Sequence, residues 1–121
     1  MNLRGLATIS GVYDLLLGLP MLVAPVAIAR LFGVPEPVPV VNAQLNGVFA
    51  LALAAGYFWA LREPSALRGY LWVAGVLAKG LGAAVFVLDH FAHGSPSSFL
   101  LFAASDGTLA LASLVLLSRR R

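Results

Sequence analysis

The sequence contains no cysteine and little charge of either sign. The absence of cysteine excludes disulfides, thiolate metal sites and thiol redox chemistry. Charged residues occupy 11% of the 121 positions, whereas 60% are hydrophobic and the mean hydropathy is +0.92. An average soluble domain is only about 45 to 50% apolar. Several windows of about 20 residues also carry one ionisable group or none, as a bilayer-spanning helix requires. The composition therefore predicts an integral membrane protein.

Four apolar segments are separated by proline, glycine and charged residues. They cover about 4–24, 40–61, 66–89 and 97–118, and each is long enough to cross a bilayer as a helix at about 1.5 Å per residue. The sequence predicts an all-α fold, a four-transmembrane-helix bundle that forms a single domain over 1–121.

The connection between the first two spans contains "PVAIARLFG" followed by "VPEPVPV". Pro25 suits the first turn of a helix, where its missing N–H costs nothing. We expect a short interfacial helix over about 26–32 and then an extended, proline-rich connection.

The distribution of arginine predicts the orientation of the spans. Arg4, Arg62, Arg68 and the triplet 119–121 fall on one side, and only Arg30 lies in the short loops of the other. Because cytoplasmic loops are enriched in basic residues, both termini are expected in the cytoplasm. Four amphipathic rings are expected in the headgroup layer at the same end: Tyr57, Trp59, Tyr70 and Trp72.

A secretory signal peptide is the competing interpretation of the N-terminus. Arg4 precedes an apolar run, and 27–29 reads Ala-Ile-Ala, similar to a cleavage site. An aspartate inside the apolar run is unfavourable in such a segment, so we expect the segment to be kept as a transmembrane helix.

Three ionisable residues lie inside the predicted spans. Asp14 is ten residues past Arg4, Lys79 eleven past Arg68 and Asp106 thirteen before Arg119. Each therefore lies ~15 to 20 Å from the same surface, near the middle of an apolar layer of roughly 30 Å. Since each charge costs a few kcal/mol when it faces lipid, the three are expected to face one another, Lys79 between two carboxyl groups.

Further polar groups are expected beside these charges. Asn42 and Asn46 are four residues apart, which places their amides on one face of the second span, somewhat nearer the outer side than the charges. Tyr13 precedes Asp14 and is either a phenolic donor to a ligand or a packed ring. Glycines flank two of the charges and permit close helix packing: Gly11, Gly18, Gly75 and Gly82. Hydroxyls for further hydrogen bonds are also present: Ser10, Ser105, Thr108 and Ser113.

The charged layer has two interpretations. Two carboxyl groups and one ammonium leave an uncompensated charge unless one carboxyl keeps its proton, so the layer could hold a proton, a cation or the polar head of a ligand. A paired Lys79 and Asp14 could equally serve only to fix the helix register.

Other site signatures are weak or absent. Asp89, His90 and His93 cluster at the outer end of the third span, where two histidines three residues apart could bind a metal or a porphyrin-like ring. No third dedicated ligand accompanies them, which favours an interfacial cap. The sequence has no nucleophile–base pair, nucleotide fingerprint or basic groove for nucleic acid, so catalysis has little direct support.

The chain resembles the small bacterial four-helix membrane proteins grouped as DoxX-like. The resemblance covers nearly the whole chain and consists of "GVYDLLLGLPMLVAP", "LFGVP", "NAQLNGVFALALAAGY", "AKGLGAAVF" and "SDGTLALASLVLL". It implies a bacterial inner-membrane location. It also implies a connection with quinone-dependent oxidation or with partner membrane enzymes.

Two hypotheses for function follow. The first is a non-catalytic accessory subunit that packs against a larger electron-transfer or photosynthetic assembly, or against copies of itself. The second is an independent protein that binds a lipid or quinone, or a redox component, with Asp14, Lys79 and Asp106 at the foot of a lipophilic pocket. Proton or cation transport is a third, less favoured hypothesis, because only one polar layer is evident. No cofactor is required by the sequence, although a quinone or lipid fits it.

Overall fold

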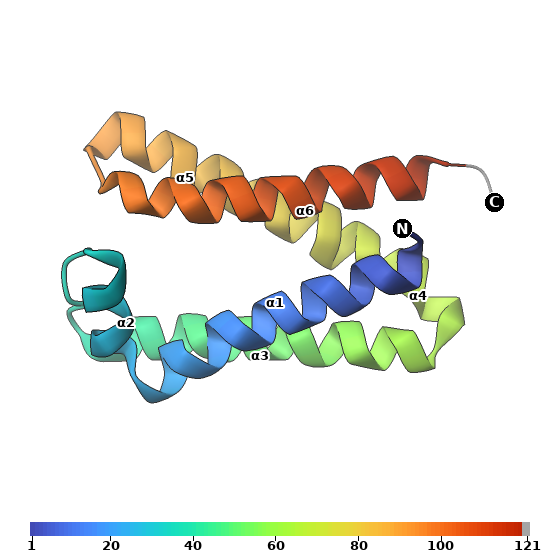
Figure 1. Cartoon of the computed structure of the whole chain (residues 1–121), viewed down its shortest axis with the longest axis horizontal. Helices are drawn as coiled ribbons and strands as arrows, with labels where there is room; N and C mark the ends of the chain where they lie inside the picture. Colours follow the sequence, from blue (N-terminus) through green and yellow to red (C-terminus); the bar gives the residue numbers. More distant parts are fainter. Residues whose placement is uncertain (120–121) are drawn as a thin grey trace.

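The chain folds as an all-α four-helix bundle in a computed structural model that describes residues 1–119 (Figure 1). Four helical stretches are long and apolar enough to cross a membrane. The third is continuous but contains a π-helical segment, η1, and the fourth begins with a 3₁₀ turn, η2. The elements in order are α1 (Leu3–Val23), α2 (Pro25–Phe32), α3 (Val40–Arg62), α4 (Pro64–Tyr70), η1 (Leu71–Ala78), α5 (Lys79–His93), η2 (Ser97–Phe99) and α6 (Leu100–Ser118).

The helix bounds lie close to those expected from the apolar segments. The third stretch differs most, because it begins at Pro64 and continues to His93, four residues past the expected end. The short helix between the first two spans is α2, with Pro25 in its first turn. It ends at Gly33, whose φ of +68° is the left-handed conformation that glycine adopts most readily.

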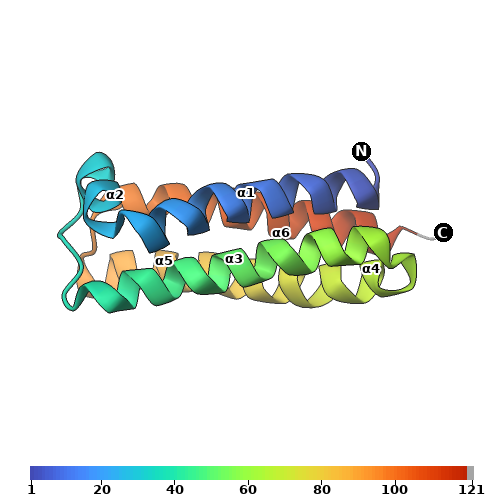
Figure 2. The same ribbon diagram turned by 90° about the horizontal axis from the view of Figure 1, so that it is seen from below.

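The four long stretches form two pairs. α1 lies beside α3, and α5 lies beside α6 (Figure 1). The view turned by 90° shows α1 above α3 and the third stretch on the side of α3, so the stretches occupy four corners (Figure 2). α1 and α3 approach closely at Gly18 and Gly47, where a Cβ on Gly18 would lie 2.8 Å from the Gly47 carbonyl oxygen. Small residues thus permit backbone contact here.

Arginine side chains hold the end of the bundle at which the two chain termini lie (Figure 1). Arg4 donates to the Leu61 carbonyl oxygen at 2.9 Å, and Arg68 donates to the Leu117 carbonyl oxygen at 2.6 Å. These carbonyls end α3 and α6, where cations complement the helix dipole. The predicted arginine triplet begins with Arg119; positions 120 and 121 lie outside the described residues.

The interior is small and the outer faces are apolar. Buried leucines and alanines pack around Tyr57, which is fully buried, and the ring of Tyr70 meets it edge-on at 5.0 Å. The sequence-based expectation for Tyr57 was therefore wrong: it packs in the core and not in a headgroup belt, because Gly47, Ala54 and Tyr57 share the inward stripe of α3. Trp59 and Trp72 are exposed, as a belt requires.

Candidate functional site

A buried ion pair joins α1 to the third stretch. Lys79 Nζ lies 2.7 Å from Asp14 Oδ1, and the two side chains are only 4% and 6% exposed. Lys79 follows directly on η1, a π-helical segment that alters the helical register just before this residue. The contact between Asp14 and Lys79 that was predicted from their equal depth is present in the structure.

Two tyrosine rings enclose the ammonium group. Lys79 Nζ lies 5.1 Å from the centroid of the Tyr13 ring and 5.7 Å from that of Tyr57. Both distances suit a cation–π interaction, which is strengthened where water is excluded. Because Tyr13 is next to Asp14 in α1, the charge pair also fixes the position of the Tyr13 ring.

The interior holds polar groups that the ion pair does not use. Asp14 Oδ2, Ser10 Oγ and Tyr57 Oη are buried and have no hydrogen-bond partner among the described residues. Ser10 and Asp14 lie one turn apart on the buried face of α1. These side chains therefore place further polar atoms in the interior beside the ion pair.

Asp106 is not a second partner of Lys79. Among the described residues no oxygen of Asp106 lies within 4.0 Å of the ammonium nitrogen. Its carboxyl group is half-buried and faces Gly82, where an added Cβ would lie 3.6 Å from Oδ2. Gly82 lies almost one helical turn past Lys79, which explains the separation. The expected three-residue charge layer is thus a pair with one carboxyl group nearby.

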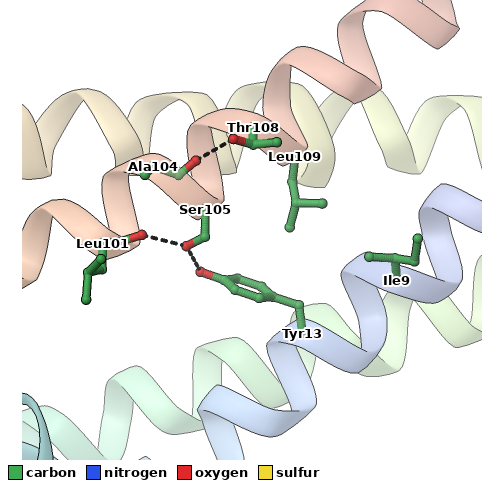
Figure 3. Close-up of a pocket in the computed structure, with 7 residues that line it drawn as sticks. All are labelled: Ile9, Tyr13, Leu101, Ala104, Ser105, Thr108 and Leu109. Carbon is green, nitrogen blue, oxygen red and sulfur yellow. Dashed lines mark hydrogen bonds between the residues drawn. The ribbon is translucent and has the colours of Figure 1, made fainter.

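A groove between α1 and α6 lies beside Tyr13 (Figure 3). It has a volume of about 460 Å³ and opens widely on the surface of the bundle. The Tyr13 hydroxyl reaches across it to Ser105 Oγ at 2.5 Å. The other lining residues are mostly apolar: Ile9, Leu101, Ala104, Thr108 and Leu109. Asp14 and Lys79 do not line this groove, so the predicted pocket with these charges at its foot is not observed.

Asn42 and Asn46 belong to a different cavity, of about 350 Å³, at the α2 end of the bundle. Both lie on the side of the ion pair away from the chain termini, as predicted, and they line this cavity and not the groove beside Tyr13. Gly47 packs against Gly18, which is already one turn past Asp14, so both asparagines lie still further toward that end. Aromatic and proline side chains form much of the wall: Pro25, Phe32, Pro35, Pro37, Phe99 and Phe102.

The histidines at the end of α5 form local hydrogen bonds. His93 Nδ1 lies 2.9 Å from Asp89 Oδ1, and His90 Nδ1 lies 2.7 Å from the Ser95 carbonyl oxygen. Ser95 Oγ donates to the second carboxylate oxygen of Asp89. Over residues 1–119, no three potential ligands are grouped as a metal site would need. These contacts describe a cap where α5 ends at Gly94, which has a φ of +68°.

Comparisons of the chain with protein families, with characterised proteins and with solved structures found no match.

The groove was not predicted from the sequence, although its three polar residues, Tyr13, Ser105 and Thr108, had been singled out. Tyr13 and Ser105 were noted separately, and the spacing of Ile9 with Tyr13 and of Leu101 with Ser105 and Leu109 is the four-residue step of one helix face. That spacing shows that each face is continuous. It does not show that the two faces meet.

Proposed function

We propose that this protein binds a lipophilic molecule with a small polar head inside the membrane, in the groove between α1 and α6. The observation that carries the proposal is the pair of hydroxyls, Tyr13 and Ser105, placed across a mostly apolar groove that opens on the surface of the bundle (Figure 3). Binding sites for small molecules are mostly apolar and contain a few placed polar groups that orient the ligand.

The size and walls of the groove suit such a ligand. About 460 Å³ is within the range of small-molecule sites, roughly 300 to 1,000 Å³. Ile9, Leu101 and Leu109 would contact an apolar tail, and each buried CH₂ group contributes about 0.8 kcal/mol relative to water. Since the tail is already in lipid, selectivity would come mainly from the polar head at Tyr13 and Ser105.

The buried ion pair has a positioning role in this proposal. Lys79 holds the Tyr13 ring through its ammonium group and is itself held by Asp14. Lys79 and Asp14 are sealed from the groove, so they would orient the binding hydroxyl without contacting the ligand. Asp106, next to Ser105, is a half-buried carboxyl group near the same site.

The DoxX-like resemblance supports the ligand class and the location as further parts of the proposal. A quinone or a membrane lipid is a lipophile of the required kind. A bacterial inner membrane is the proposed location, with both termini in the cytoplasm, because Arg4, Arg62 and Arg68 lie toward the end that carries the termini.

Photolabelling in lipid nanodiscs tests the proposal. Long-chain probes with a diazirine in the tail and an alcohol or a ketone head should label Ile9, Leu101 and Leu109 in preference to other outward-facing residues. Ala104→Trp fills the groove and should abolish this labelling, whereas Ala84→Trp, on the exposed surface of α5, should preserve it. Equal labelling of Leu88, Phe91 and the groove would contradict the proposal.

The accessory-subunit hypothesis is the second proposal, and a specific observation favours it. Large apolar side chains are strongly exposed on several helices, including Leu16 (67%), Phe49 (68%) and Phe91 (79%). A neighbouring transmembrane helix would cover them as well as lipid does. Gentle solubilisation followed by mass measurement tests it, because a subunit should migrate with a larger assembly, and a lone chain would contradict this hypothesis.

A further inference from the structure

The hydrogen bonds in the groove account for every hydroxyl hydrogen that lines it. Thr108 Oγ1 donates to the Ala104 carbonyl oxygen at 2.7 Å (Figure 3). Ser105 Oγ donates to the Leu101 carbonyl oxygen at 2.9 Å. Ser105 Oγ also lies 3.3 Å from the Phe102 carbonyl oxygen. Since a serine hydroxyl has one hydrogen, and here it points to these helix carbonyls, we assign Tyr13 as the donor of the 2.5 Å contact between Tyr13 and Ser105. All three hydrogens are therefore in use.

Among the described side chains that line the groove, no other is a donor. The remaining lining side chains are Ile9, Leu101, Ala104 and Leu109, which have no polar hydrogen. The backbone N–H groups of the lining residues lie inside α1 and α6, where the helical pattern uses them, except that of Leu101, which is in the first turn of α6. By contrast, the Tyr13, Ser105 and Thr108 oxygens retain lone pairs that can accept. The groove is thus an acceptor surface.

We infer that the ligand of the groove is a lipophilic molecule whose head carries an O–H group, such as a hydroxyl-bearing lipid or the reduced quinol form of a quinone, and not one whose head is only a carbonyl or an ether, as in an oxidised quinone. This inference rests on the proposed function and specifies its ligand class. An O–H head can donate to Tyr13 Oη or Ser105 Oγ and leaves every existing hydrogen bond in place. A carbonyl head can bond only after Tyr13 gives up its bond to Ser105, since a hydroxyl hydrogen serves one strong bond at a time.

Three probes test the inference. They share one diazirine-bearing tail and end in an alcohol, a methyl ether or a methyl ketone, and each is titrated into nanodiscs that contain the intact chain. Labelling of Leu101 and Leu109 against probe mole fraction gives the apparent affinity. The alcohol should bind about fivefold more tightly than the ether and the ketone, the effect expected of one net hydrogen bond.

Ser105→Ala provides a sharper test, because it removes the acceptor that occupies the Tyr13 hydrogen. Tyr13 then has a free O–H, and the ketone should gain about fivefold in affinity, so that its disadvantage against the alcohol disappears. Thr8→Val is the matched control. Thr8 also donates to a carbonyl of its own helix, that of Arg4, but lies outside the groove, so the preference for the alcohol should be unchanged.

The outcomes separate the inference from the proposed function. Equal affinities for the three probes in the wild-type groove, or a preference for the ketone, would overturn the inference and leave lipophile binding intact. Absence of groove labelling by all three probes would overturn both. The affinities of the three probes for the wild-type chain test the inference by themselves. The inference can therefore be overturned even if the Ser105→Ala chain fails to fold.

Discussion

At the scale of single residues, the pairing of Asp14 with Lys79 makes each side chain depend on the other. The two groups are in contact at 2.7 Å and almost sealed from the surroundings. Removal of one partner leaves a buried charge without compensation, which is far more costly than the loss of an exposed pair.

We expect Asp14→Asn and Lys79→Met each to lower the free energy of unfolding by about 3 to 5 kcal/mol. The double variant Asp14→Leu/Lys79→Met should recover most of the loss, because no charge remains buried. Denaturant titration in bicelles measures these differences.

Glu36→Gln is the control. It breaks the exposed Arg30–Glu36 pair, with its 3.5 Å contact, and should change stability by less than about 1 kcal/mol. If the loss of stability were the same at the buried Asp14–Lys79 pair and at the exposed Arg30–Glu36 pair, the expected mutual dependence of Asp14 and Lys79 would be refuted.

Tyr57 and Tyr70, whose rings are in edge-to-face contact, are expected to differ in how the loss of the hydroxyl group affects stability. Tyr70 Oη donates to the Leu53 carbonyl oxygen at 2.7 Å, whereas the buried Tyr57 Oη has no partner among the described residues. Tyr70→Phe should therefore lower the free energy of unfolding by about 1 kcal/mol, and Tyr57→Phe should leave it unchanged or raise it. The same titration checks both variants. A larger loss of stability at Tyr57 than at Tyr70 would contradict this expectation and show that the Tyr57 hydroxyl has a hydrogen-bond partner inside the bundle.

At the scale of the elements, the helices follow from the length of the apolar segments, and the ion pair follows from counting depth along them. The rotation of each helix about its axis could not be predicted. That rotation turns Asp106 toward Gly82 and places Asn42 and Asn46 at the other cavity. The π-helical segment before Lys79 also has no distinct signal in "LWVAGVLA", because it depends on packing with neighbouring helices.

The close approach of α1 and α3 predicts a specific sensitivity to small side chains. A Cβ at Gly18 would lie 2.8 Å from the Gly47 carbonyl oxygen and 2.9 Å from the Leu51 amide nitrogen. Gly18→Ala should lower the free energy of unfolding by about 1 to 3 kcal/mol. Gly69→Ala, where a Cβ meets nothing within 4 Å, should instead stabilise the chain by up to about 1 kcal/mol. Unfolding in bicelles measures both variants. If Gly18→Ala and Gly69→Ala changed the free energy of unfolding equally, the close approach of α1 and α3 would not contribute to stability.

At the scale of the whole molecule, most of the described arginines lie toward the end that holds both termini: Arg4, Arg62, Arg68 and Arg119. Arg30, in α2, lies at the other end. The positive-inside tendency then predicts that the end with both termini is cytoplasmic. The chain has no cysteine, so an introduced thiol can be labelled without background. Ser65 and Ser97 are both exposed. Ser65 lies at the start of the third stretch and Ser97 lies just past its other end, at the start of the fourth, so Ser65→Cys and Ser97→Cys place thiols at opposite ends of the bundle.

A membrane-impermeant maleimide applied to intact cells should label Ser97→Cys and should leave Ser65→Cys unlabelled until the cells are permeabilised. The cysteine-free parent chain is the control for both. The reverse pattern would invert the proposed orientation, and labelling of both positions in intact cells would contradict the assignment of four spans.

The central claim is that the groove between α1 and α6 holds a lipophilic molecule at the hydroxyls of Tyr13 and Ser105. Native mass spectrometry of the chain, released directly from the membranes in which it is expressed, tests this claim without a chosen probe. We predict a small-molecule adduct on the wild-type chain and on Ala84→Trp, and its loss from Ala104→Trp. A wild-type chain without an adduct, or an adduct that persists when Ala104→Trp fills the groove, would contradict the claim.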